Sequence, residues 1–195
     1  MGKLREINDR FNKELDQLLA GKLEKGHVFK LGRPGKILRK TGFPAEQEIE
    51  LSARRLDEKS MAGHHPFSST DLKDLVKAIN EPVAVFAYGD KNKAQNVIVE
   101  IQTNNRNFLV GIHFDQDLQG VSVSSIRTLF PKDNHEWLNW INQGKLLYAN
   151  IKKLQAVVTQ QQTNPADVGY LNLEHIENII QENKNVKHYF TAKTY

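Results

Sequence analysis

Residues 96–114 read NVIVEIQTNNRNFLVGIHF, and this stretch decides the fold. Apolar side chains alternate with other residues through 96–103 and again through 107–114, a period of two that predicts two β-strands. The intervening Asn104-Asn105-Arg106 has the composition of a turn. Two strands joined by so short a connection pair antiparallel, so the stretch predicts a β-hairpin.

One further strand is expected on each side of this hairpin. An apolar run precedes it at Val83–Tyr88, and a strand at Val121–Phe130 follows a turn at Asp115–Gly120. Alternation in this fourth strand slips near Ser124-Ser125. A bulge there would restore its inward face and redirect the neighbouring polar side chains, whereas the alternative is a strand buried on both sides. Consecutive strands with short turns predict an antiparallel meander of four or more strands.

Helical spacing of apolar residues flanks the strands on both sides. The expected helices cover residues 3–20, 52–61, 70–81, 134–144, 150–162 and 173–183. Ser52 is placed to cap the second of them, and a short strand is expected at Lys145–Ala149. The predicted fold class is therefore α+β: N-terminal helices, then the antiparallel meander, then C-terminal helices.

The first helix is separated from the rest by residues 21–47, which are rich in Gly, Pro and Lys. We therefore expect its apolar stripe to lie outside the main core, on the surface or paired with a second chain. Between Lys22 and Lys40 there are seven Lys and Arg residues and one acid, Glu24. Such a stretch is either a basic linker or an arm that follows the phosphates of a nucleic acid.

The composition excludes several classes of protein. The chain has 195 residues, a net charge of +4 and no cysteine, which excludes disulfides and thiolate zinc sites. The histidines do not cluster apart from His64 and His65, and no phosphate loop or dinucleotide fingerprint is present, so neither a metal nor a cofactor is expected. The sequence contains no apolar run of about 18 residues and no secretory signal. We expect a cytoplasmic location and no membrane partner.

The densest chemistry lies between Glu48 and Phe67, where carboxylates alternate with Arg55, Lys59 and the His64-His65 pair. Such side chains cleave a phosphodiester without a metal, because an imidazole moves the proton while cations stabilise the phosphorane. The alternative is a solvated helix face of mixed charge. His113 is a second histidine candidate, on the strand face opposite the apolar side chains. A sheet histidine satisfied by its neighbours is the commoner case.

Four motifs occur in combination: Ile49–Leu56 with Lys59, His65–Phe67, Asn80–Phe86 and Trp140–Ala149. Together they resemble the C-terminal domain of phage Mu-type head-morphogenesis (MuF) proteins. That family is grouped with the barnase, EndoU, colicin and RelE-like ribonucleases. The resemblance implies N-terminal helices before a four-stranded antiparallel sheet, and metal-independent RNA cleavage by a phage or mobile-element effector or toxin.

The resemblance divides the chain into three parts: an amphipathic helix and basic linker over 1–27, a ribonuclease-like domain over 28–168, and a short helix and tail over 169–195. The expected catalytic residues are His65, Lys59, Arg55, Arg127 and Thr128, and the expected RNA-binding residues are Ser125, Lys132, Lys36, Arg39 and Lys40. In this scheme His65 is the general acid or base. The cations Lys59, Arg55 and Arg127 stabilise the phosphorane, and the hydroxyl of Thr128 or Ser125 orients a phosphate oxygen.

The chain departs from the family pattern in two ways. It begins at a Met without a portal-associated domain, which implies a free-standing role, and Leu129-Phe130 replaces an expected aromatic hydroxyl. The expected partners are RNA, with transfer RNA as one candidate, a cognate inhibitor protein, and a second copy bound through residues 3–20. The rival function is a non-catalytic binding module of a phage or mobile element that docks on a protein through that helix. An immunity protein is a weaker third candidate, because the net charge is positive.

Overall fold

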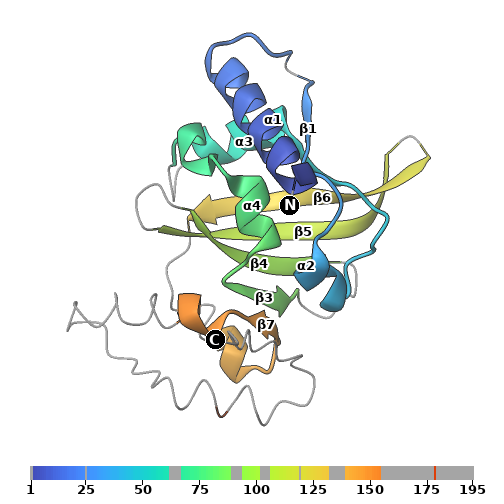
Figure 1. Cartoon of the computed structure of the whole chain (residues 1–195), viewed down its shortest axis with the longest axis vertical. Helices are drawn as coiled ribbons and strands as arrows, with labels where there is room; N and C mark the ends of the chain where they lie inside the picture. Colours follow the sequence, from blue (N-terminus) through green and yellow to red (C-terminus); the bar gives the residue numbers. More distant parts are fainter. Residues whose placement is uncertain are drawn as a thin grey trace, which may run out of the picture.

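A seven-stranded sheet forms the centre of the computed structural model (Figure 1). The structure describes residues 2–24, 26–61, 67–88, 94–101, 106–118, 120–131, 139–154 and 178. Within these ranges it describes the backbone alone for Lys59, Ser60, Met61, Glu100, Ile101, Arg106, Asp117 and Leu118. The strand order across the described sheet is β1-β2-β6-β5-β4-β3-β7.

The strands are β1 (Val28–Lys30), β2 (Ile49–Ser52), β3 (Ala84–Ala87), β4 (Ala94–Ile101), β5 (Arg106–Leu118), β6 (Val121–Pro131) and β7 (Leu146–Ala149). Strands β3 to β6 pair antiparallel in chain order, which confirms the predicted meander. β7 adds to the edge at β3, and β2 pairs parallel with β6 and antiparallel with β1. The predicted turn at 115–120 is wrong in extent, because β5 continues to Leu118.

The helical elements are α1 (Gly2–Leu19), α2 (Lys36–Lys40), α3 (Ala53–Met61), the 3-10 helix η1 (Ser69–Leu72) and α4 (Leu75–Asn80). The predicted cap of α3 is confirmed, because Ser52 Oγ accepts from the Arg55 backbone N–H at 3.1 Å. The helix predicted at 70–81 is split, because Asp74 has a left-handed backbone with φ of 65°. Residues 139–142, 151–154 and 178 are helical, and the rest of the predicted C-terminal helices lies outside the described residues.

Apolar side chains fill a cluster on each face of the sheet. The first face is covered by α1, α3 and α4 and includes Val97, Val110 and Leu129 from successive strands. Figure 1 shows α1 and α4 crossing in front of this face. The second face carries a smaller cluster around Phe86 and Leu109, packed against residues from 139–142 and 151–154. We refer to these surfaces below as the first face and the second face.

The prediction that the stripe of α1 lies outside the main core is wrong. Phe11 and Leu15 are only 1% and 0% exposed and belong to the first-face cluster. Leu38 and Phe43, from the segment predicted to be a linker, are buried in the same cluster. The apolar stripe of α1 is therefore buried against this chain's own core. The opposite side of the helix lies at the surface, and Leu19 near its end is 48% exposed.

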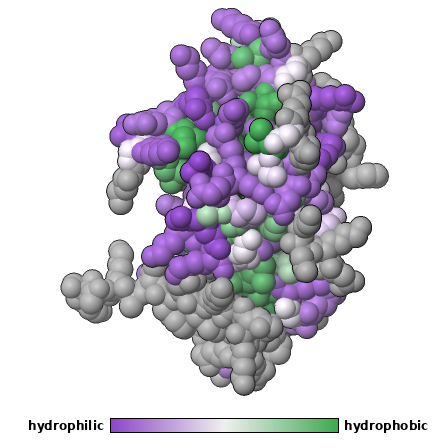
Figure 2. Space-filling model, turned by 90° about the vertical axis from the view of Figure 1, so that its right-hand side faces the viewer, coloured by the Kyte–Doolittle hydropathy of each residue, from purple (hydrophilic) through white to green (hydrophobic). Residues whose placement is uncertain are grey.

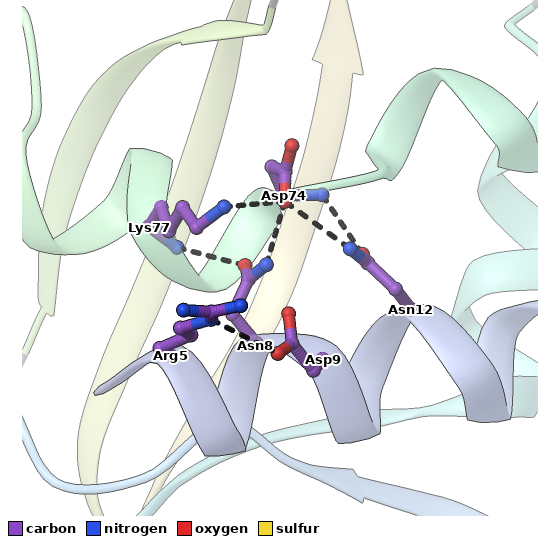
Figure 3. A network of polar contacts seen from close by, with 6 residues as sticks. All are labelled: Arg5, Asn8, Asp9, Asn12, Asp74 and Lys77. Carbon is purple, nitrogen blue, oxygen red and sulfur yellow. Dashed lines mark hydrogen bonds and ion pairs between the residues drawn. The ribbon is translucent and has the colours of Figure 1, made fainter. Parts of the chain in front are cut away.

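Polar contacts fix α1 against the start of α4 (Figure 3). Asp74 Oδ1 accepts from the side-chain amides of Asn8 at 2.6 Å and Asn12 at 3.1 Å. The Asp74 backbone N–H donates to Asn12 Oδ1 at 2.9 Å, and Lys77 N donates to Asn8 Oδ1 at 3.3 Å. Burial acts to raise the pKa of Asp74, but the hydrogen bonds from Asn8, Asn12 and Lys77 and the lysine charge lower it overall.

Hydrophilic residues predominate on the side of the molecule drawn in Figure 2, and apolar residues show there as separate patches. Among the described residues, the large hydrophobic side chains that are exposed are Leu19 on α1, Val28 on β1, Tyr88 directly after β3 and Val121 on β6. Among the described residues no helix combines the length and the apolar character needed to span a membrane.

Candidate functional site

Part of the second face is polar. Asn96, Gly111 and Thr128 lie in one row across β4, β5 and β6, and His113 pairs with Ser125 in a neighbouring row. Opposite residues of antiparallel strands project from the same face, so these side chains share the face that carries Leu109 and Phe86 further along the strands. We call Asn96, His113, Ser125 and Thr128 the polar cluster.

His113 is half-buried in this cluster, and its ring centroid lies 5.4 Å from that of Tyr88. Burial lowers the pKa of His113 below its ordinary value, and the positive charge of Arg127 lowers it further. Both effects disfavour the imidazolium, so the neutral ring predominates at neutral pH. A neutral imidazole is able to accept a proton from a bound hydroxyl.

Arg127 occupies a β-bulge. The pairing of β6 with β5 skips Arg127, which lies between the paired residues Ile126 and Thr128. The bulge lets Ile126 and Leu129, three positions apart, both reach the first-face cluster. The predicted bulge in the fourth strand is therefore confirmed, but it lies two residues beyond Ser124-Ser125.

The Arg127 side chain is exposed, and its Nη2 donates to Gln116 Oε1 at 2.9 Å. This hydrogen bond connects β6 to β5 beside the polar cluster. A guanidinium has five N–H donors and is well suited to phosphate oxygens. The bulge therefore places the Arg127 cation near His113. Half-buried hydroxyls flank Arg127 along β6, at Ser125 and Thr128.

Thr128 covers Gly111, because a Cβ on the glycine would lie 2.9 Å from the Thr128 Cβ. Asn96 flanks Gly111 from the other strand and is 6% exposed. Its Oδ1 has no hydrogen-bond partner in the described part of the chain. An unpaired buried amide oxygen costs about 1–3 kcal/mol, and such groups often mark functional positions.

Of the predicted catalytic residues, the structure brings Arg127 and Thr128 together with Ser125 on one strand. Arg55 instead forms an ion pair with Glu58 at 3.3 Å, on a helix whose inward residues lie in the first-face cluster. No hydrogen bond or ion pair among the described residues joins Arg55 to the polar cluster. The Lys59 side chain, His65 and Lys132 lie outside the described residues, so their roles stay predictions.

The predicted RNA-binding residues Lys36, Arg39 and Lys40 form the short helix α2, where the first two are exposed and Lys40 is half-buried. Thr41, directly after α2, hydrogen-bonds with Gln95 near the start of β4. The neighbouring Ala94 pairs with His113. These cations therefore lie at the same end of the sheet as His113, but on the other face.

Sequence reasoning missed Asn96 and Tyr88 as site residues and kept His113 only as a second candidate. The signal was present in the alternation, because Asn96, Gly111 and His113 occupy the outward positions of their strands. Polar residues at such positions ordinarily face water, so the pattern alone does not indicate a site. Among the described residues no group of three or more His, Asp or Glu side chains is arranged to hold a metal ion.

The sequence model of the family described as Phage MuF-C-terminal domain matches residues 56–156. The match begins inside α3 and includes strands β3 to β7, so it covers the whole polar cluster. Helices α1 and α2 and strands β1 and β2 precede it. No curated protein and no solved structure matches the chain.

Proposed function

This chain belongs to the phage MuF C-terminal domain family, and we propose that it is a metal-independent endoribonuclease of the phage or mobile-element effector type. We also propose that the chain is a member of the barnase, EndoU, colicin and RelE-like ribonuclease superfamily. The polar cluster and the neighbouring Arg127 carry the proposed activity, because an imidazole, a guanidinium and two hydroxyls lie together around the bulge in β6. These groups supply the proton transfer and charge stabilisation that phosphodiester cleavage requires.

In the proposed reaction, His113 accepts the proton of an RNA 2′-hydroxyl. The 2′-oxygen attacks the adjacent phosphorus, the bond from phosphorus to the 5′-oxygen breaks, and a 2′,3′-cyclic phosphate forms. The departing 5′-oxygen needs a proton, and we assign that role to His65. Lys59 belongs to α3, which covers the first face, so we assign the charge of the phosphorane to Arg127.

Thr128 and Ser125 donate hydrogen bonds to the non-bridging phosphate oxygens in this scheme. The 40% exposed ring of Tyr88 offers a stacking surface for a nucleobase. The cations of α2 hold the RNA backbone at the end of the sheet. Their contribution to binding falls as salt rises, because it comes from counterion release.

The test is incubation of the purified protein with total RNA in EDTA, followed by analysis of the new ends. We expect fragments that end in 2′,3′-cyclic phosphate. His113→Ala should lower the cleavage rate by about a hundredfold or more, as for a lost general base. Arg127→Ala should lower it by about 10²–10³-fold, as for a lost electrostatic donor. Arg54→Ala is the matched control, because Arg54 is 82% exposed and pairs with Glu58 on α3.

Undiminished cleavage by His113→Ala would remove His113 from the mechanism, and undiminished cleavage by His65→Ala would remove His65. A wild-type protein that leaves RNA intact would favour the non-catalytic module that docks on a protein instead. The apolar stripe of α1 gives that rival no support, because it packs inside this chain.

A further inference from the structure

Gln47 lies in the loop between α2 and β2, and it is 9% exposed although it is polar. Its amide nitrogen donates to Asp115 Oδ1. Its amide oxygen accepts from the Asp115 backbone N–H at 3.0 Å and from Ser124 Oγ at 3.1 Å. One side chain from outside both strands therefore joins β5 to β6.

This contact lies where the register of the two strands shifts a second time. Beyond the His113–Ser125 pair, β5 has one residue more than β6 before pairing resumes. The extra residue leaves Asp115 with φ of 52°. A left-handed backbone of this kind costs a non-glycine residue about 1–3 kcal/mol and persists only where surrounding contacts hold it. The three hydrogen bonds of Gln47 are such contacts.

Both strands are held next to the proposed site. Asp115 is two residues beyond His113 on β5, and Ser124 directly precedes Ser125 on β6. We propose that Gln47 is a positioning residue that holds the His113 imidazole in place against Ser125, an inference that rests on the proposed function. Since Gln47 precedes residue 56, the segment before the family match contributes to the geometry of the site.

Gln95 is the matched control, because it is also a buried glutamine bonded to a distant loop. Its Nε2 donates to the Thr41 carbonyl, and its Oε1 accepts from Thr41 Oγ1 at 3.0 Å. Gln95 pairs with Ile112, which belongs to the first-face cluster, so its side chain lies on the face opposite the polar cluster. A variant at Gln95 loses the same kind of hydrogen bond without touching Asp115 or Ser124.

A reciprocal exchange of donor and acceptor tests the contact. In Gln47→Glu, two carboxylates face each other with no side-chain N–H between them. Adding Asp115→Asn restores a donor on the other side, while the backbone N–H of residue 115 and the Ser124 hydroxyl still donate to the glutamate. Gln47→Met removes the hydrogen bonds at similar volume without adding a charge, and it replaces Gln47→Glu if that variant does not fold.

Two readouts separate positioning from general stability. The NMR signals of the His113 imidazole, assigned with His113→Gln, report its surroundings whether or not RNA is cleaved. With RNA, kcat and KM are measured separately. We expect Gln47→Glu and Gln47→Met to shift the His113 signals and to lower kcat about 10–100-fold, with KM changed less than about twofold. The double variant should return both readouts toward wild type. Gln95→Glu should lower the urea midpoint and leave the His113 signals unchanged.

His113 signals that stay in place in both single variants at Gln47 would overturn the inference. So would a double variant as impaired as Gln47→Glu alone, or an equal shift of the signals in Gln95→Glu. If the wild-type protein cleaves no RNA, the proposed function fails, while the His113 spectra still decide whether Gln47 positions the ring.

Discussion

The charge of Arg127 reaches His113 because a bulge places the guanidinium beside the polar cluster. Burial is the larger cause of the lowered pKa of His113, and Arg127 is the second. Removing the positive charge should therefore raise the pKa toward its ordinary value without restoring it fully. We expect Arg127→Ala to move the NMR titration midpoint of His113 upward, while Arg127→Lys keeps most of the shift. A midpoint that is unchanged in Arg127→Ala would show that burial alone sets it.

The lowered pKa of His113 makes both the stability of the fold and the proposed cleavage depend on pH. A histidine with a lowered folded pKa binds fewer protons when folded than when unfolded. Its neutral form therefore contributes stability above the unfolded pKa of about 6.5, and this contribution is lost as pH falls through the folded value. The active base is the same neutral form, so the proposed cleavage should weaken as pH falls below that value.

Gly111 is needed for its small size, because a Cβ there would meet the Thr128 Cβ at 2.9 Å. Gly111→Ala should destabilise the protein by about 1–3 kcal/mol in urea unfolding, as overpacking of a dense site does. Thr128→Gly removes the opposing Cβ, so the double variant should lose less stability than the two single losses added together. Strict additivity would mean that the backbone relaxes around the new methyl group.

At the scale of elements, one carboxylate, that of Asp74, accepts two of the hydrogen bonds that join α1 to the start of α4. Hydrogen bonds and the Lys77 charge outweigh burial and hold the pKa of Asp74 below its ordinary value of 3.8. A lowered folded pKa means that the unfolded chain binds more protons. The stabilisation is therefore present above pH 3.8 and is lost as pH falls through the folded value.

The free energy of unfolding should fall less steeply between pH 5 and pH 3 in Asp74→Asn than in the wild-type protein. Urea unfolding at several pH values measures this difference. Asp9→Asn is the control, because Asp9 lies on α1 outside the Asn8 and Asn12 contacts and pairs with Arg5. Equal slopes in all three proteins would exclude Asp74 as the anchor of α1.

Elements with their own periodicity were predictable, and elements set by distant partners were not. The strands within 96–114 follow from alternation, and Ser52 follows from capping chemistry. β2 has four residues and a parallel partner far along the chain, so no local pattern distinguishes it from a loop. Asp74 bonds to α1, and Gln47 bonds to the left-handed backbone of Asp115, both through contacts that sequence spacing does not reveal.

At the scale of the whole molecule, the family match and the folded unit have different limits. The match begins at residue 56, yet Phe29, Ile49 and Leu51 are 0–1% exposed in the first-face cluster. β2 also covers the outer edge of β6 next to Ser125. The segment before the match therefore completes both the core and the edge of the sheet on which the proposed site lies.

A chain that begins at residue 56 should consequently fail to fold. It loses at least five buried large side chains from the core, Phe11, Leu15, Phe29, Ile49 and Leu51. Each contributes about 1.5–3 kcal/mol when fully buried, so together they are comparable to the 5–15 kcal/mol that stabilises a typical domain. Removal also exposes the β6 edge, which invites pairing with other chains. Circular dichroism and size-exclusion chromatography should show an unfolded or aggregated product.

Complementation distinguishes a missing core from a defect of expression. The fragment 1–55, added in trans, should restore the spectrum and any RNA cleavage of the chain that begins at residue 56, because β2 and α1 bind it through the contacts they make in the intact protein. The same fragment carrying Leu51→Asp should fail, since a charge buried in the first-face cluster has no partner there. A truncated chain that folds and melts cooperatively alone would show that the chain from residue 56 onward folds autonomously and that its core does not need the N-terminal elements.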